Sequence, residues 1–165
     1  MEVSLQQYRI KTKFRLYQSC VVSTLLYGSE YWRMTVSNLT KRSLFHTKNL
    51  RRIKRVFWRN TKSNKELLAQ CHQESMETIL VRRRWRWIEH VLRREPENIT
   101  RVALHWTPEG KRQRGRPKNT WRITVEEELK TLKHNWSTIR KQAPSKQQWR
   151  TFVAALHARR HKDSK

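Results

Sequence analysis

The residues with the clearest chemistry lie between Leu80 and Glu95, where the chain reads LVRRRWRWIEHVLRRE. Guanidinium groups match the geometry of phosphate oxygens, and indole rings either stack on bases or pack in a core. A second basic cluster, KRQRGRPK, follows at Lys111 to Lys118. Together the two clusters indicate a surface for nucleic acid rather than a pocket for a small-molecule substrate.

The first cluster is expected to lie on a helix, so its side chains face in different directions. Arg82, Arg86 and Arg93 share one side of that helix, whereas Trp85 and Trp87 are expected to anchor it in a core. The alternative is a charged face that is merely solvated, but few carboxylates exist to pair with these arginines. The predicted nucleic-acid-binding residues are Arg82, Arg83, Arg86, Arg93, Arg94, Arg112, Arg114, Arg116 and Lys118.

The segment Arg114-Gly115-Arg116-Pro117 resembles the core of the AT-hook, which lies along the narrow minor groove of A·T-rich DNA. Glycine permits close approach of the backbone, proline keeps the strand extended, and narrow grooves attract arginine. The alternative is a basic turn that contacts phosphates or is only solvated.

The charge of the chain limits the classes of partner. Its 165 residues include 38 Lys and Arg against 13 Asp and Glu, a formal net charge of +25. Such a charge attracts polyanions, and we expect nucleic acid rather than an anionic membrane surface as the partner. Because 36% of the residues are hydrophobic and eight are tryptophan, we expect helices around a small core. Self-repulsion should make that core marginal until a polyanion binds.

The sequence offers no candidate for a cofactor, a metal or a catalytic centre. Cys20 and Cys71 form no CxxC pair and are expected to be reduced, buried thiols; the alternative is one long-range disulfide between them. His157 and His161 have metal-ligand spacing on a helix, but no third ligand accompanies them. We find no Ser/His/Asp arrangement, no glycine-rich phosphate loop and no Asp-Asp pair, so we do not expect the chain to be an enzyme on its own.

The longest apolar stretch, from Val21 to Tyr27, is far too short to span a membrane. The N-terminal residues lack the apolar region of a signal peptide. We therefore expect a soluble protein without a membrane partner, in the nucleus or in the cytoplasm.

The spacing of apolar residues predicts the elements that carry these residues. Ile10, Phe14, Tyr17, Val21 and Leu25 recur at helical spacing and should form one buried face. Helices are predicted at about 6–27, 37–57, 63–71, 75–94, 121–134 and 149–156. Ser63 and Glu66 have the spacing of a capping box at the start of the third helix, and Pro96 should terminate the fourth.

A small hairpin is predicted after the fourth helix. Val102, Leu104 and Trp106 alternate with Arg101, Ala103 and His105, as in a strand, and 107–110 has the proline and glycine of a tight turn. The basic residues 111–116 would form the returning arm. The expected fold is therefore mainly α, with five to six helices and one small basic β-hairpin, divided into regions 1–60, 61–96 and 97–165.

Four segments, in order, resemble the C-terminal part of the reverse transcriptase polyprotein of non-LTR, LINE-type retrotransposons, with an RTE-like character. They are LYQSCVVSTLLYGSEYW from Leu16, SLFHTKNLRRI from Ser43, RRRWRWIEHVLRRE from Arg82 and ALHWTPEGKRQRGRPKNTWR from Ala103. The resemblance extends over about residues 8–161. Two residues depart from the pattern: Glu89 stands where a glycine is common, and Tyr31 stands where a threonine is common.

This resemblance implies thumb-like helices at the N-terminus that grip template and primer, followed by a region that binds element RNA or target DNA. The endonuclease and the palm with its metal-binding aspartates lie outside this chain, and no catalytic residue of the family maps onto it. RNA or DNA, together with the missing palm and fingers, would be its partners, in the nucleus or with element RNA in the cytoplasm. Three alternatives stay open: a free-standing AT-hook-like chromatin protein, a non-functional mobile-element relic, and a helical adaptor for acidic proteins.

Overall fold

The structure, a computed structural model, describes residues 2–57, 62–106, 115 and 120–163. The chain forms two compact units. The first unit comprises Met1–Ser29 and Met34–Val81, and the second comprises Glu30–Arg33 and Arg82–Lys165. The boundary between Val81 and Arg82 falls inside the helix α5 (Met76–Leu92). The three-part division expected from the sequence stays a prediction.

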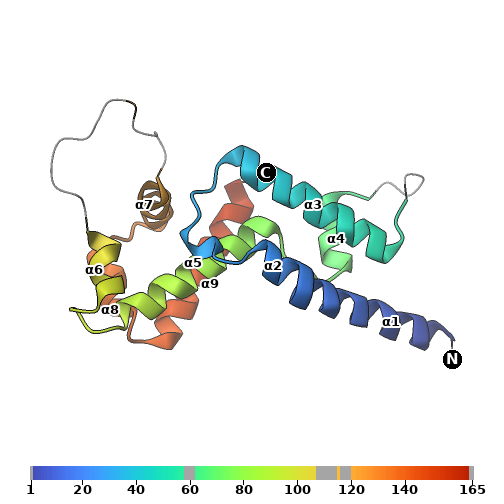
Figure 1. Cartoon of the computed structure of the whole chain (residues 1–165), viewed down its shortest axis with the longest axis horizontal. Coiled ribbons are helices and arrows are strands. Elements are labelled where there is room, and N and C mark those ends of the chain that lie inside the picture. The colour runs from blue at the N-terminus through green and yellow to red at the C-terminus, as the bar shows by residue number, and fades with distance from the viewer. Residues whose placement is uncertain (1, 58–61, 107–114, 116–119, 164–165) are drawn as a thin grey trace. The chain divides into compact units, whose positions relative to one another are not determined.

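The first unit is built from helices α1 (Glu2–Leu16), α3 (Val36–Lys54) and α4 (Asn64–Gln70), together with the beginning of α5. A π-helical segment η1 (Tyr17–Val22) and the short α2 (Ser23–Leu25) continue α1 without a break. Helix α3 packs against both α1 and α4 (Figure 1). Gly28, at φ +66°, adopts the left-handed conformation that follows this first long helical run.

The π-helical segment changes which side chains of the first helix are buried. Phe14 and Tyr17 lie in the core as expected, but the buried residues after them are Val22 and Leu26, whereas Val21 is exposed. A π-helix takes more residues per turn than an α-helix. Its extra residue therefore shifts the buried face by one position, and the prediction that Val21 and Leu25 continue that face is wrong.

A buried polar pair holds η1 to α3 inside the first unit. The hydroxyl of Tyr17 and Nδ1 of His46 are 2.9 Å apart, and Nε2 of His46 lies 3.2 Å from the carbonyl oxygen of Glu74. Because a carbonyl only accepts, Nε2 carries the ring proton and Nδ1 accepts from Tyr17. Burial raises the pKa of Tyr17 to about 12, so its hydroxyl stays a donor. Burial lowers the pKa of His46 and so favours the neutral ring.

Side-chain caps fix where the helices of the first unit begin. Thr35 accepts from the backbone N–H of Asn38 at the start of α3. The predicted capping box is confirmed: Ser63 accepts from the N–H of Glu66, whose carboxylate accepts from the N–H of Ser63. These bonds satisfy amide groups that a helix start leaves without partners.

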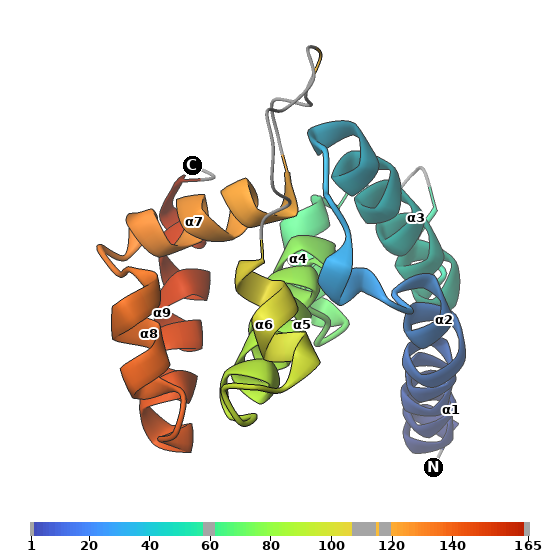
Figure 2. The same ribbon diagram turned by 60° about the vertical axis from the view of Figure 1, so that its left-hand side comes forward.

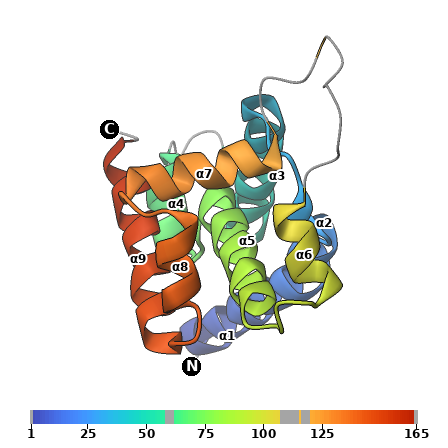
Figure 3. The same cartoon turned by 90° about the vertical axis from the view of Figure 1, so that its left-hand side faces the viewer.

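The second unit contains the end of α5 and the helices α6 (Ile99–His105), α7 (Trp121–Thr131), α8 (Trp136–Gln142) and α9 (Lys146–Asp163). Helices α8 and α9 lie side by side, with α7 crossing near one end of the pair (Figures 2 and 3). The helix predicted at 149–156 lies within α9, and its apolar residues Trp149, Phe152 and Leu156 are buried. Trp85 of α5 contacts the rings of Trp149 and Phe152.

The strand predicted at Val102, Leu104 and Trp106 is wrong, because residues 99–105 form the helix α6. Asn98 caps this helix by accepting from the N–H of Thr100, and Leu104 is buried while Val102 is exposed. A helix of seven residues buries so few side chains that they also fit a strand pattern. The turn and the returning arm of the expected hairpin, 107–114 and 116, lie outside the described residues.

The chain is mainly helical, as expected, but it has more helices than predicted. Counting α1, η1 and α2 as one, the described residues form eight helices beside the 3-10 turn η2 (Ser29–Tyr31), and no strand. The two helices that the sequence did not indicate, α6 and α8, have seven residues each. Asn98 and Asn135 cap them, and such short segments carry too few apolar residues for a clear period.

Candidate nucleic-acid interface

A basic cleft of about 630 Å³ lies between α5 and α9 in the second unit. Three arginines from α5 and the residue after it, Arg82, Arg86 and Arg93, line one side. Lys146 and Arg150 of α9 line the other. Among the described residues that line the cleft, Glu89 is the single carboxylate. We refer to these five cations as the cleft cations.

The amphipathic character of α5 explains why its arginines reach this cleft. Trp85, Ile88 and Val91 are almost fully buried and hold one face of the helix in the core. Residues on the opposite side must then face solvent, and Arg82 and Arg86 are exposed. Trp85 is thus a core anchor, as predicted. Trp87 is half-buried and contacts the rings of neighbouring aromatic residues at their edges.

Two contacts hold Arg93 in place at the end of the cleft. Its Nε donates to the carbonyl oxygen of Ala143, 2.8 Å away, and its Nη2 lies 2.9 Å from Oε1 of Glu89. The guanidinium is therefore ordered before any ligand arrives, which lowers the entropy cost of a contact. The carboxylate of Glu89 competes with a phosphate for the same donors, so it should weaken anion binding.

Three of the other cleft cations have fewer contacts with the protein than Arg93. Within the described part of the chain, Arg86, Lys146 and Arg150 make no ion pair with a carboxylate. All three are exposed. Like charges gathered in a concave surface raise the local concentration of anions. The cleft can therefore accept the oxygens of a phosphodiester chain.

Of the nine predicted binding residues, the structure brings Arg82, Arg86 and Arg93 together in the cleft and leaves Arg83 and Arg94 outside its lining. Arg83 lies outside the cleft lining, with its Nη1 3.9 Å from a carboxylate oxygen of Glu30. Arg94 also lies outside this lining and approaches Nε2 of His90 at 3.0 Å. The second basic patch, at Arg112, Arg114, Arg116 and Lys118, lies outside the described residues.

Two cleft residues, Lys146 and Arg150, were not predicted from the sequence. They stand four positions apart on a helix whose buried face was recognised, and this spacing puts both on one flank. This spacing can be seen in the sequence, but the position of Lys146 and Arg150 opposite the arginines of α5 depends on how α9 packs in the second unit.

Arg84 sits in the middle of the arginine run and is 3% exposed. Its Nη1 lies 2.5 Å from Oε1 of Glu128 on α7, while Nε1 of Trp85 donates to Oε2 of the same carboxylate at 2.6 Å. This buried ion pair links α5 to α7, so Arg84 stabilises the second unit rather than contacting phosphate.

Other kinds of site have little support in the described residues. They contain no group of three or more His, Cys, Asp or Glu that could hold a metal ion. The side chains of His157 and His161 lie outside the described part. Both cysteines are free thiols, but the expectation that both are buried is wrong for Cys20, which lies on the surface of η1. Burial raises the pKa of Cys71.

Among the described helices, none combines the length and the apolar character needed to cross a membrane. Comparisons with known proteins identified no match: no protein-family model, no curated protein and no solved structure is similar to this chain.

Proposed function

We propose that this chain binds the phosphate backbone of RNA or DNA through the cleft between α5 and α9. The observation that carries the proposal is the gathering of five cations around one carboxylate in a single cleft. Lysine and arginine side chains that replace counterions on a nucleic acid supply affinity without reading sequence. The chain would then act in the nucleus, or with RNA in the cytoplasm, as a binding protein rather than as an enzyme on its own.

The wider proposal is that the chain is the C-terminal portion of a LINE-type reverse transcriptase, acting beside a palm and fingers supplied by the rest of the polyprotein. The four segments that resemble this family, and that follow one another in the same order along the chain, support the proposal. On this proposal the chain contributes grip on template, primer or target, and the polymerase and endonuclease centres lie elsewhere.

The test is fluorescence anisotropy of a labelled RNA stem-loop over a salt series. Replacing Arg86 and Arg150 with glutamine should weaken binding to every sequence and reduce the salt slope by about one unit for each lost contact. Lys130→Gln is the matched control, since Lys130 is an exposed cation of α7 that does not line the cleft.

An unchanged slope in the double variant would refute the cleft as the binding site. Mixed-sequence and A·T-rich duplexes serve as competitors. Equal competition by the two duplexes fits backbone binding. Selective competition by the A·T-rich duplex would instead indicate that the AT-hook-like segment at 114–117 binds the DNA.

A further inference from the structure

An exposed indole lines a cleft of about 430 Å³ beside α6 in the second unit, which we call the α6 cleft. Trp106, the residue after α6, is 63% exposed, whereas every other tryptophan that the structure describes is buried or half-buried. Pro96 and Val102 line the same cleft and are exposed as well. Large aromatic side chains on a surface are typical of contacts with a partner. The α6 cleft therefore offers a flat apolar ring to a ligand.

Hydrogen bonds fix the backbone that carries this ring. The N–H of Trp106 donates to the carbonyl oxygen of Val102 at 2.9 Å. Nη2 of Arg122 donates to the carbonyl oxygens of Leu104 and Trp106 at 2.9 and 3.0 Å. The backbone of Trp106 is therefore ordered before a ligand arrives, which lowers the entropy cost of a contact with the ring.

Two guanidinium groups line the α6 cleft with the indole. Arg140 of α8 is exposed and forms no ion pair within the described part of the chain. Nη1 of Arg101 donates to the carbonyl oxygen of Arg94 at 2.6 Å, which uses one of its five N–H donors. No carboxylate is found among the described residues that line this cleft. Guanidinium groups match the oxygens of a phosphate, so a phosphate is the anion expected here.

The imidazole of His105 also lines the α6 cleft and is surrounded by positive charge. Burial lowers the pKa of His105, and the charges of Arg140, Arg122 and Arg101 lower it further. The imidazole is therefore neutral at pH 7, and the arginines supply the charge of the cleft. A ligand that fits has a flat ring and an attached anion.

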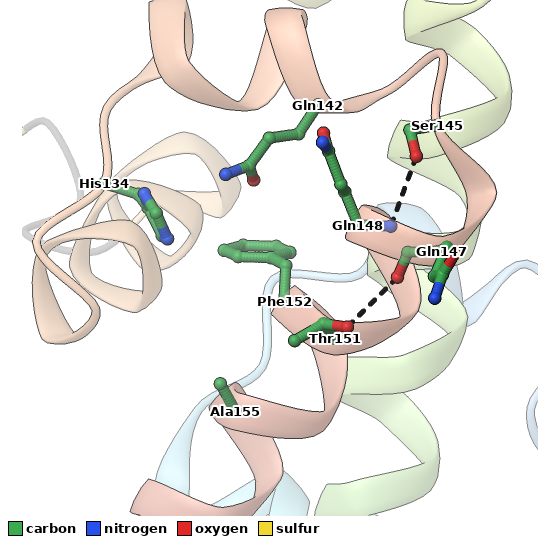
Figure 4. A pocket seen from close by; sticks show the side chains of 8 residues that line it. All are labelled: His134, Gln142, Ser145, Gln147, Gln148, Thr151, Phe152 and Ala155. Carbon is green, nitrogen blue, oxygen red and sulfur yellow. Dashed lines mark hydrogen bonds between the residues drawn. The ribbon is translucent and has the colours of Figure 1, made fainter.

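A larger hollow of the same unit, of about 680 Å³ between α8 and α9, lacks this combination (Figure 4). The ring of Phe152 in that hollow is 4% exposed, and no lysine or arginine is among the described residues that line it. The basic cleft has cations, but its indole, that of Trp149, is buried. Of these three sites in the described residues, the α6 cleft is the one that joins an exposed ring to cations.

We propose that the α6 cleft binds one unpaired nucleotide of a single strand, whose base stacks on Trp106 and whose phosphates contact Arg140 and Arg101. A base that stacks on an aromatic ring gains affinity whatever its identity, because every base has a flat face. The proposal rests on the proposed backbone binding and adds a preference for strands with unpaired bases. An acidic peptide with an apolar side chain is the competing occupant, and the basic cleft of the same unit favours a nucleic acid.

The experiment measures the affinity of the full chain for two labelled strands of equal length. One is a single-stranded oligoribonucleotide, and the other is a spacer strand with phosphates but no bases. We expect the strand with bases to bind about tenfold more tightly. Trp106→Leu keeps an apolar side chain but removes the flat ring, so it should abolish that preference without changing the salt slope. Trp106→Phe should retain most of the preference.

Tyr27→Leu is the matched control for the ring. Tyr27 is an exposed aromatic residue of the first unit, so its replacement should leave the preference unchanged. Trp106 and Tyr27 are both exposed, and unchanged thermal melting will show that each variant folds.

The phosphate contacts are tested separately from the ring. Arg140→Gln should weaken the binding of both strands and reduce the salt slope by about one unit. Lys141→Gln removes the same charge from the next residue of α8, which is exposed and does not line the α6 cleft. This control should leave the slope unchanged, and an equal effect of the two variants would overturn the phosphate contact at Arg140.

Equal affinity of the unaltered chain for both strands, with a steep salt slope, would overturn the stacking site and leave backbone binding intact. A preference that survives in Trp106→Leu would overturn the assignment to this ring. If neither strand binds, backbone binding fails and the stacking site fails with it. If Trp106→Leu weakens the binding of a labelled glutamate-leucine peptide as much as that of the strand with bases, the cleft accepts acidic peptides and the nucleotide assignment is overturned.

Discussion

At the scale of single residues, the core of the second unit depends on a buried ion pair. Glu128 is 2% exposed and accepts from Arg84 and from the indole of Trp85. Removing two charges from water is costly, and the cost is compensated only while both partners are present. Six arginines occur between Arg82 and Arg94. Arg84 is the one that stands four and seven residues before the buried Ile88 and Val91, so helical spacing puts it on the buried face of α5, and Glu128 of α7 supplies its counterion.

Glu128→Gln should lower the free energy of unfolding by about 3 kcal/mol, because it leaves the Arg84 guanidinium buried without a counterion. Urea denaturation measures this loss. Glu127→Gln is the matched control: its side chain is exposed, so the change should stay within about 0.5 kcal/mol.

Adding Arg84→Met to Glu128→Gln tests the cause of that loss. Most of the stability should return, because the buried charge is removed while the glutamine carbonyl still accepts from Trp85. A double variant as unstable as Glu128→Gln would show that the loss comes from packing rather than from the unpaired charge.

Another single residue, His46, should make stability depend on pH. Its folded pKa is lowered, mainly by burial, below the ordinary value of 6.5. The unfolded chain therefore binds more protons between these two values. The contribution of His46 is complete above pH 6.5 and is lost as the pH falls through the folded pKa. Protonation would also take from Tyr17 its acceptor at Nδ1.

Urea midpoints measured between about pH 5 and pH 8 will check this expectation. His46→Gln should flatten the dependence relative to the unaltered chain. His105, whose pKa is lowered mainly by burial, contributes in the same direction and should account for the slope that remains. An unchanged slope in His46→Gln would contradict the prediction.

At the scale of elements, the π-helical segment η1 changes the consequence of mutating neighbouring residues. Val22→Ala should lower the free energy of unfolding by about 2 kcal/mol, because Val22 is 2% exposed. Val21→Ala removes the same atoms from a side chain that is 39% exposed and should cost much less. Thermal denaturation measures both losses of stability. Equal losses in the two variants would contradict the shifted buried face. A larger loss in Val21→Ala would indicate a regular α-helical period through this segment.

The elements that could be predicted are those with local signals. Ser63 and Glu66 are three residues apart, so the capping box that starts α4 could be identified from the sequence. The long apolar faces of α5 and α9 were recognisable for the same reason. Helix α6 could not be predicted, because the apolar pattern of its seven residues fits both a helix and a strand. Which of the two forms depends on the packing of Leu104.

At the scale of the whole molecule, the net charge of +25 dominates the behaviour of the chain. The positive side chains repel one another in the folded state and attract polyanions from a distance, and salt screens both effects. Each of the two units packs its own side chains, as the Tyr17–His46 and Arg84–Glu128 pairs show. A bound nucleic acid would neutralise the charge and stabilise the fold by mass action.

The sequence by itself determined the helical class, the buried faces of α5 and α9, one capping box and the excess of positive charge, because each depends on residues close together in the chain. Only the tertiary structure decided that Glu128 pairs with the buried Arg84, and that Lys146 and Arg150 stand across a cleft from Arg82 and Arg86. These features join residues far apart in sequence, and such residues meet only when the helices pack.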